Sequence, residues 1–147
     1  MLSTTAEYAL RIMVTLTANN ESAMTSEQIA RSTQVPVDYS VKVLQALARG
    51  GLVKAQRGRG GGFRITCDPA ETSLLTVISA IDESLSGNEM KPLDTPTPVL
   101  ATLRGHVTGT LATARNAFGQ TTLRSVVDTS EATNAHMHSN GSAAMAG

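Results

Sequence analysis

Three arginines and four glycines stand close together in the segment Arg57-Gly58-Arg59-Gly60-Gly61-Gly62-Phe63-Arg64. Guanidinium groups bind phosphate oxygens through paired hydrogen bonds, and glycines let a backbone turn tightly or approach another molecule closely. No acidic residue occurs from Val41 to Ile65, a span that holds six of the chain's twelve lysines and arginines. The pattern therefore predicts a surface that faces a polyanion.

A polar helix face precedes this basic segment. Asp38 is predicted to cap a helix from Tyr39 to about Arg49, which Gly50-Gly51 ends. The apolar side of this helix is expected to carry Val41, Val43, Leu44 and Leu47, and the polar side Tyr39, Ser40, Lys42 and Gln45. Since an α-helix fits the major groove of DNA, we expect Lys42 to contact a phosphate or guanine and Ser40 a base or phosphate.

Other chemistry fits the same residues less well. A nucleotide-binding loop needs a helix directly after the glycines and usually a Gly-Lys-Ser/Thr ending, whereas Phe63-Arg64-Ile65 continues as a strand. A flexible basic turn without a partner remains an alternative. Enzymatic function is not expected, because no nucleophile–base pair with an orienting acid is evident, and His106 is assigned to a helix surface or interface.

Short elements in the N-terminal half must position these side chains. Helical periodicity runs from about Ser3 to Ala18, and Thr25 with Gln28 forms a capping-box pattern before a short helix that ends near Thr33. Residues 52–56 and 62–66 are predicted strands, so that the arginine–glycine run is the turn of a hairpin. The order predicts a mainly α fold with a small β-hairpin, in which residues 1–83 form a winged helix-turn-helix DNA-binding domain.

The second half is predicted to contain a loop and a long helix. An amphipathic helix opens at Thr72 or Ser73 and includes Ile81, and residues 84–97 are rich in turn formers. Pro98 suits the first turn of a helix to about Phe118, with an apolar stripe of Val99, Leu103, Val107, Leu111, Ala114 and Phe118. Residues 98–127 comprise this helix and a short final element. Residues 128–147, including His136 and His138, are expected to form a disordered, solvated tail.

Composition limits the setting of the protein. The formal net charge is zero, but residues 1–65 are basic and the remainder is acidic. No apolar run is long enough to span a membrane, and no signal peptide is recognisable, so we expect a cytoplasmic protein without membrane contact. The single cysteine, Cys67, fits a reducing compartment.

The glycine-rich hairpin and the residues before it resemble a known family. Val35-Pro36-Val37-Asp38-Tyr39-Ser40-Val41-Lys42-Val43-Leu44-Gln45, followed by the arginine–glycine run, is similar to the IscR/NsrR/CymR family of bacterial winged helix-turn-helix transcriptional regulators. Residues 3–11 and 76–82 also fit, so the resemblance covers about residues 1–127. It implies a homodimeric repressor, assembled on the long C-terminal helix, that binds a partly palindromic operator in double-stranded DNA.

Two sets of residues follow as predicted contacts. A narrow minor groove attracts arginine, so Arg57 and Arg59 at the hairpin tip are expected to enter it. The DNA-contacting set is Thr25, Ser26, Tyr39, Ser40, Lys42, Gln45, Lys54, Arg57, Arg59, Gly60 and Gly61. The dimerisation set is Val99, Leu103, Val107, Leu111 and Phe118.

The resemblance also raises the question of an iron–sulfur cluster. Many members hold one through three cysteines in the loop before the dimerisation helix and at its start, but residues 86–104 contain no cysteine here. We therefore expect no metal and no cofactor, and a member that lacks the cluster cysteines. A small-molecule effector, a protein partner, oxidation of Cys67 and replacement of the cluster ligands remain open as explanations of the signal.

One alternative function belongs to another class. The winged helix could serve as a dimerisation platform for a protein-interaction module controlled by a partner. The acid-free block from Val41 to Ile65 argues against this alternative, since such a surface suits a polyanion.

Overall fold

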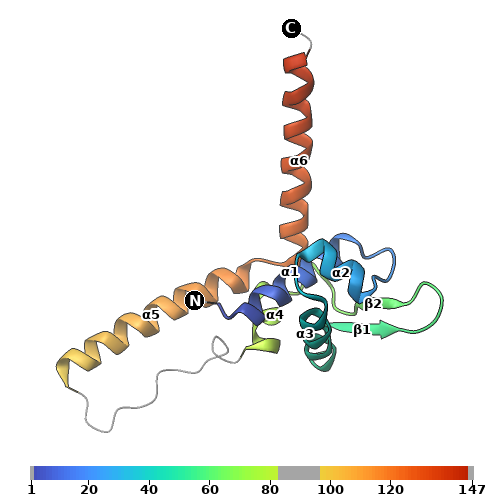
Figure 1. The fold of residues 1–147 in the computed structure, drawn as a ribbon. Coiled ribbons are helices and arrows are strands. Elements are labelled where there is room, and N and C mark those ends of the chain that lie inside the picture. The colour runs from blue at the N-terminus through green and yellow to red at the C-terminus, as the bar shows by residue number, and fades with distance from the viewer. Residues whose placement is uncertain (1, 83–96, 146–147) are drawn as a thin grey trace.

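The computed structural model describes residues 2–82 and 97–145. The element order is α1 (Thr4–Ala18), α2 (Ser26–Thr33), α3 (Val37–Arg49), β1 (Val53–Gln56), β2 (Gly62–Ile65), α4 (Leu74–Ile81), α5 (Pro98–Gln120) and α6 (Leu123–Met145). Helices α1 to α4 and the hairpin gather in a head, from which α5 and α6 extend in different directions (Figure 1). The predicted class, mainly α with one β-hairpin, is confirmed.

Side-chain caps set the starts of the first helices. The Ser3 hydroxyl accepts from the Ala6 amide at 3.1 Å, and the predicted capping box between Thr25 and Gln28 is complete. Helix α3 begins earlier than expected, at Val37, and its N-cap is Pro36 without a side-chain hydrogen bond. The prediction of Asp38 as the cap was wrong. Its carboxylate lies in the first turn of α3, where it still complements the positive end of the helix dipole.

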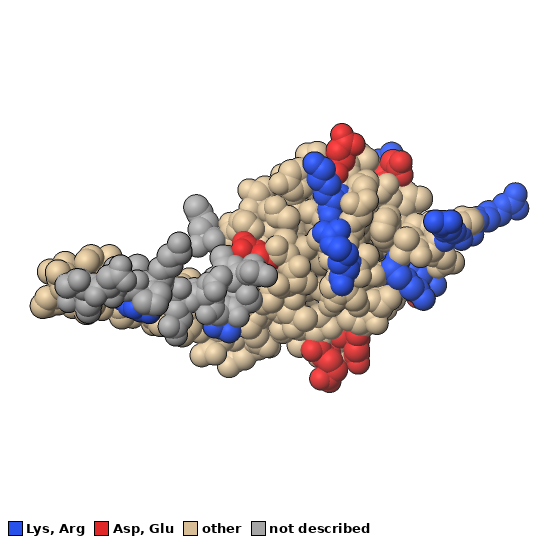
Figure 2. Space-filling view, turned by 90° about the horizontal axis from the view of Figure 1, so that it is seen from below, with Lys and Arg blue, Asp and Glu red and all other residues tan. Residues whose placement is uncertain are grey.

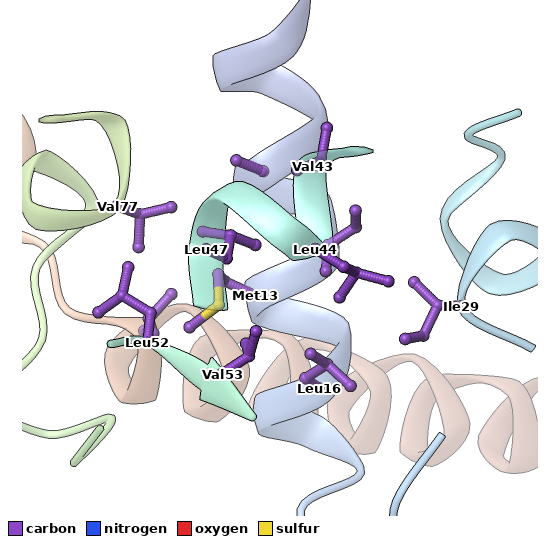
Figure 3. Close-up of a cluster of buried hydrophobic side chains, with 12 residues drawn as sticks. Met13, Leu16, Ile29, Val43, Leu44, Leu47, Leu52, Val53 and Val77 are labelled. Carbon is purple, nitrogen blue, oxygen red and sulfur yellow. The ribbon is translucent and has the colours of Figure 1, made fainter. Parts of the chain in front are cut away.

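The core of the head lies where α1 crosses α2, α3, β1 and α4. Met13 and Leu16 of α1 meet Leu44 and Leu47 of α3, and all four side chains are buried (Figure 3). Aliphatic side chains and methionine fill this core, as expected for a chain without tryptophan. The helix-turn-helix therefore rests on a packed base that fixes the orientation of α3.

The hairpin is a two-stranded antiparallel sheet with a fixed register. Val53 lies opposite Ile65, and Lys54 lies opposite Arg64. Phe63 and Ile65 pack against the core. Because side chains alternate along a strand, Arg64 lies on the other face of the hairpin, together with Lys54. The strands match the predicted ones, except that each is one residue shorter.

The C-terminal helices are attached to the head at one junction. Thr97 caps α5 and Pro98 occupies its first turn, as predicted for proline. Where α5 passes into α6, the Leu74 amide donates to the Thr121 carbonyl at 2.8 Å, and the Leu123 amide donates to the Thr72 carbonyl at 3.0 Å. Leu123 is fully buried in the core, so the start of α6 is fixed to the head.

Helix α6 contradicts the predicted disordered tail. The helix continues through Asp128 to Met145, although residues 128–139 are all exposed. The prediction rested on composition and missed a tertiary contact. Buried Leu123 and Val127 fix the first turn, from which a helix propagates more easily than it nucleates.

Two further predictions meet different outcomes. The predicted loop 84–97 falls outside the described residues except for Thr97, so its role stays a prediction. Within the part of the chain that the structure describes, no helix combines the length and apolarity needed to cross a membrane.

Candidate DNA-binding surface

The exposed face of α3 is the first component of the candidate surface. Tyr39, Lys42 and Gln45 are exposed and follow one another at intervals of three residues, so they share one side of the helix. Arg49, seven residues after Lys42, lies on this side too and was missed in the predicted set, although the same spacing would have found it. The face thus offers two cations, an amide and a phenol.

Contacts with α1 hold Tyr39 in place. Its ring meets Tyr8 edge to face, with ring centroids 5.4 Å apart and planes at 84°. Its hydroxyl lies 3.3 Å from the Thr5 hydroxyl oxygen. Tyr39 as a whole residue is nevertheless 41% exposed. Tyr39 therefore packs partly against α1. It lies near the N-terminal end of α3, which is the part of a recognition helix that contacts base edges.

The structure corrects the role predicted for Ser40. This side chain is fully buried, and its hydroxyl has no hydrogen-bond partner among the described residues. Ser40 precedes Val43, Leu44 and Leu47 by three, four and seven residues, which is the spacing of one helix face. It therefore lies with the core residues and cannot contact a base or phosphate. The helical spacing of Ser40 thus indicates the buried face, although serine is a polar residue.

The N-terminus of α2 is the second component. The Thr25 hydroxyl accepts the Gln28 amide at 3.2 Å, and the Gln28 side chain accepts the Thr25 amide at 2.9 Å. Ser26 is half-buried, and its hydroxyl lies 3.4 Å from a Glu27 carboxylate oxygen. The hydroxyl hydrogen of Thr25 stays available to donate, at the helix end that carries partial positive charge. This end can accept an anion such as a backbone phosphate.

The hairpin turn is the third component. Arg57, Arg59 and Gly60 are exposed at the tip, and Lys54 is exposed on the first strand. Gly58 and Gly60 have φ angles of 91° and 71°, which L-residues rarely adopt. A Cβ on Gly61 would stand 2.5 Å from the Gln56 carbonyl oxygen, so this position also requires glycine. The glycines shape a narrow tip that presents two arginines.

Basic side chains gather on the face seen in Figure 2. They form a band from the middle of the head to the projecting tip, while most acidic side chains in this view lie at the upper and lower edges. Not every cation is directed outward. Arg64 donates to the carbonyls of Asn20 and Glu21, and Arg11 pairs with Glu7. The structure therefore brings α3, the start of α2 and the hairpin together and removes Arg64 from the free cations.

Helix α5 carries the predicted dimerisation residues on an uncovered surface. None of its residues is buried, and Val99 and Leu103 are 77% and 49% exposed. The remaining members of the stripe, Val107, Leu111 and Phe118, are only half-buried. Side chains of this type normally lie in a core or an interface, and a row of them that the described residues leave largely uncovered predicts a partner.

The described residues offer little for binding metal. Cys67 is half-buried and packs against the core, and it is the only cysteine of the chain. No cluster of three metal-ligating side chains occurs among the described residues. A shallow groove of 370 Å³ lies between α4 and α5 and includes Leu75, Arg115 and Asn116. It is one place where a small-molecule effector, one of the open explanations of the signal, could bind.

Comparisons with known proteins agree with this architecture. The Rrf2 family, described as an iron-dependent transcriptional regulator, matches residues 2–129. Protein aau3 of Rhizobium meliloti is 34% identical over 85 residues, which are 58% of this chain and 55% of that protein. The HTH-type transcriptional regulator NsrR of Bacillus subtilis is 28% identical over 86 residues, 58% of this chain and 59% of that protein. The chain thus spans about half the length of the curated relatives it matches.

A solved structure extends the likeness to the whole fold. CymR, the global cysteine regulator of B. subtilis, superposes with a TM-score of 0.75 at 22% identity. The match covers 87% of this chain and 96% of that one. At this identity the likeness concerns the fold alone, and it includes the winged-helix head together with the C-terminal helices.

Proposed function

Because the chain belongs to the Rrf2 family of transcriptional regulators, we propose that it binds a specific operator in double-stranded DNA and represses transcription as a homodimer. Members of this family are regulators and not enzymes. The observation that carries the proposal is the exposed polar face of α3 beside the hairpin tip, with no acidic residue between Val41 and Ile65.

The proposed docking places α3 in the major groove. Tyr39, Lys42 and Gln45 would then face bases or the flanking phosphates. The hairpin reaches along the DNA from the C-terminal end of α3, so Arg57 and Arg59 would enter the adjacent minor groove. The Gly60 and Gly61 backbone can approach phosphates closely, and Lys54 adds a cation on the strand leading to the tip.

The start of α2 supplies the proposed third contact. Thr25 and Ser26 stand at a capped helix N-terminus, which attracts an anion through its unpaired amides and dipole. Contacts to phosphates fix the position of the protein along the DNA, whereas the α3 contacts read the sequence. This division of roles predicts that substitutions at the start of α2 weaken binding to all DNA sequences alike.

The proposed dimer pairs two copies of α5. A two-fold axis would place the stripe of Val99, Leu103, Val107, Leu111 and Phe118 against its equivalent and cover side chains that are exposed in one copy. Two α3 helices would then meet half-sites separated by about one DNA turn, roughly 34 Å. This arrangement explains why the operator should be partly palindromic.

The residues present do not fit an iron–sulfur cluster. Such clusters are held mainly by thiolates, and this chain has one cysteine, placed after the hairpin and packed on the core. We therefore propose a member that senses its signal without a cluster. A small molecule in the groove beside Arg115 and Asn116, or a protein partner, would replace the cluster as effector.

Selection of DNA tests the proposed function. Full-length protein is incubated at low salt with a pool of random-sequence duplexes, and the retained DNA is sequenced. We expect enrichment of a partly palindromic sequence, which then serves as the operator in all further measurements. Retention of no duplex would favour the protein-interaction module. Iron content and the visible spectrum of anaerobically purified protein test the cluster: we expect neither iron nor colour, and stoichiometric iron would contradict this.

A further inference from the structure

Arg64 lies within the basic segment but is directed toward the protein. One guanidinium nitrogen, Nη2, donates to the Asn20 carbonyl at 3.0 Å and lies 3.4 Å from the Glu21 carbonyl. Both carbonyls belong to the connection between α1 and α2. The side chain therefore links the second strand of the hairpin to residues that precede α2. These residues lie 43 and 44 positions away in the sequence.

The register of the hairpin makes this orientation favourable. Lys54 lies directly opposite Arg64, and two like charges in such a cross-strand pair repel each other. Turning the Arg64 guanidinium to backbone carbonyls separates the charges and leaves Lys54 exposed. The two cations of the pair thus have different surroundings, although sequence alone gives them the same character.

The end of α1 supplies a second reason. No basic residue occurs in the last turn of α1, where the helix dipole presents partial negative charge. The Asn20 and Glu21 carbonyls lie two and three residues beyond Ala18, the last residue of α1. The Arg64 guanidinium therefore places a positive charge near this end of the helix.

A backbone link stands beside the Arg64 contact. The Met24 amide donates to the Phe63 carbonyl at 3.1 Å, and the Phe63 amide donates to the Met24 carbonyl at 2.7 Å. Met24 immediately precedes Thr25, the cap of α2. The hairpin is consequently joined to the entrance of α2 at two points, one through backbone and one through the Arg64 side chain.

We infer that Arg64 is a positioning residue, which fixes the hairpin tip relative to α2 and α3 and contacts no DNA phosphate. The inference rests on the proposed DNA-binding function, because it says how that surface is held in shape. Arg57 and Arg59 can reach a groove only where the strands direct them. The connection before α2 therefore sets the angle at which the tip meets the DNA.

The test compares Arg64→Ala with Lys54→Ala, its partner across the hairpin. Operator affinity is measured over a range of salt concentrations, because each lost phosphate contact lowers the slope of log affinity against log salt by about 0.9. We expect Lys54→Ala to lower the slope by this amount. Arg64→Ala is expected to weaken binding roughly tenfold, the effect of about 1.4 kcal/mol, with a smaller loss of slope than Lys54→Ala because the tip arginines stay near the DNA. An equal loss of slope in Arg64→Ala would overturn the inference, as would unchanged affinity.

A second readout does not depend on DNA. Amide hydrogen exchange is measured at Met24 and Phe63 in the wild type and in both variants. We expect faster exchange at both amides in Arg64→Ala and wild-type exchange in Lys54→Ala, whereas unchanged exchange in Arg64→Ala would refute the link. Failure of the wild type to bind DNA would count against the proposed function only, since the exchange result still decides whether Arg64 holds the hairpin.

Discussion

Met24 and Phe63 exchange two backbone hydrogen bonds, which join the second strand of the hairpin to the residue before the cap of α2. The segments around Met24 and Phe63 approach each other closely because Gly62 has no side chain. A Cβ at that position would stand 2.3 Å from the Met24 carbonyl oxygen. The contact between the hairpin and the helix-turn-helix therefore depends on a glycine that lies outside the exposed tip.

Gly62→Ala is expected to separate the hairpin from α2. The φ of 141° and the collision with Met24 both oppose the new side chain, so we expect a loss of roughly 3 kcal/mol in the free energy of unfolding. Gly58→Ala is the matched control, because its φ is also positive but its Cβ would meet nothing within 4 Å. In the control, the free energy of unfolding measured with urea should fall by only about 1 kcal/mol. Equal losses in the two variants would count against the close contact.

Arg57→Ala should weaken operator binding strongly. Loss of a guanidinium from a narrow groove is expected to cost about 1–3 kcal/mol of binding free energy, as measured by fluorescence anisotropy. Arg31→Ala removes the same charge from the last turn of α2, outside the proposed contact set, and should change affinity little. The assignment of the hairpin tip to DNA fails if Arg57→Ala binds the operator as tightly as the Arg31 control does.

Ser40→Ala and Lys42→Ala separate the two sides of α3. Removal of the buried, unpartnered Ser40 hydroxyl should raise the free energy of unfolding by about 1 kcal/mol and leave operator affinity unchanged. Removal of the exposed Lys42 amine should leave stability unchanged and lower the salt slope by about 0.9 if it contacts a phosphate. Weaker operator binding by a fully folded Ser40→Ala protein would contradict the buried placement.

Leu103→Glu should produce monomers. A carboxylate in the centre of the proposed interface would be buried without a partner, a cost that a dimer held by one helix pair cannot absorb. Ala101→Glu places the same charge roughly 160° around α5 from Leu103, at an exposed position, and should leave the dimer intact. Sedimentation velocity distinguishes the two masses. A wild type that sediments as a monomer, or a dimeric Leu103→Glu protein, would refute the role of α5.

Sequence reasoning succeeded where a short pattern has one structural solution. The Thr25–Gln28 pair gave the start of α2, and Pro98 gave the start of α5, because each satisfies backbone groups that only a helix terminus exposes. The glycine-rich turn was found for a related reason. Positive φ angles at Gly58 and Gly60 are what such a sequence accommodates.

Two of the failures share a different cause, which is dependence on distant contacts, whereas a third overlooked a local pattern. Ser40 was placed on the polar face by its residue type, although its helical spacing to Val43 and Leu44 indicates the buried face. The direction of Arg64 follows from carbonyls 43 and 44 residues away, which no local pattern shows. Helix α6 was missed because its first turn is fixed by burial of Leu123 in the head.

The salt dependence of operator binding by the wild-type protein tests the central claim most directly. Affinity is measured for the selected operator and for a scrambled duplex of the same length and composition, from low to physiological salt. We expect preference for the operator and a steep, linear fall of log affinity with log salt, at about 0.9 per phosphate contact. No detectable binding at low salt, or equal affinity for both duplexes, would contradict a sequence-specific DNA-binding regulator.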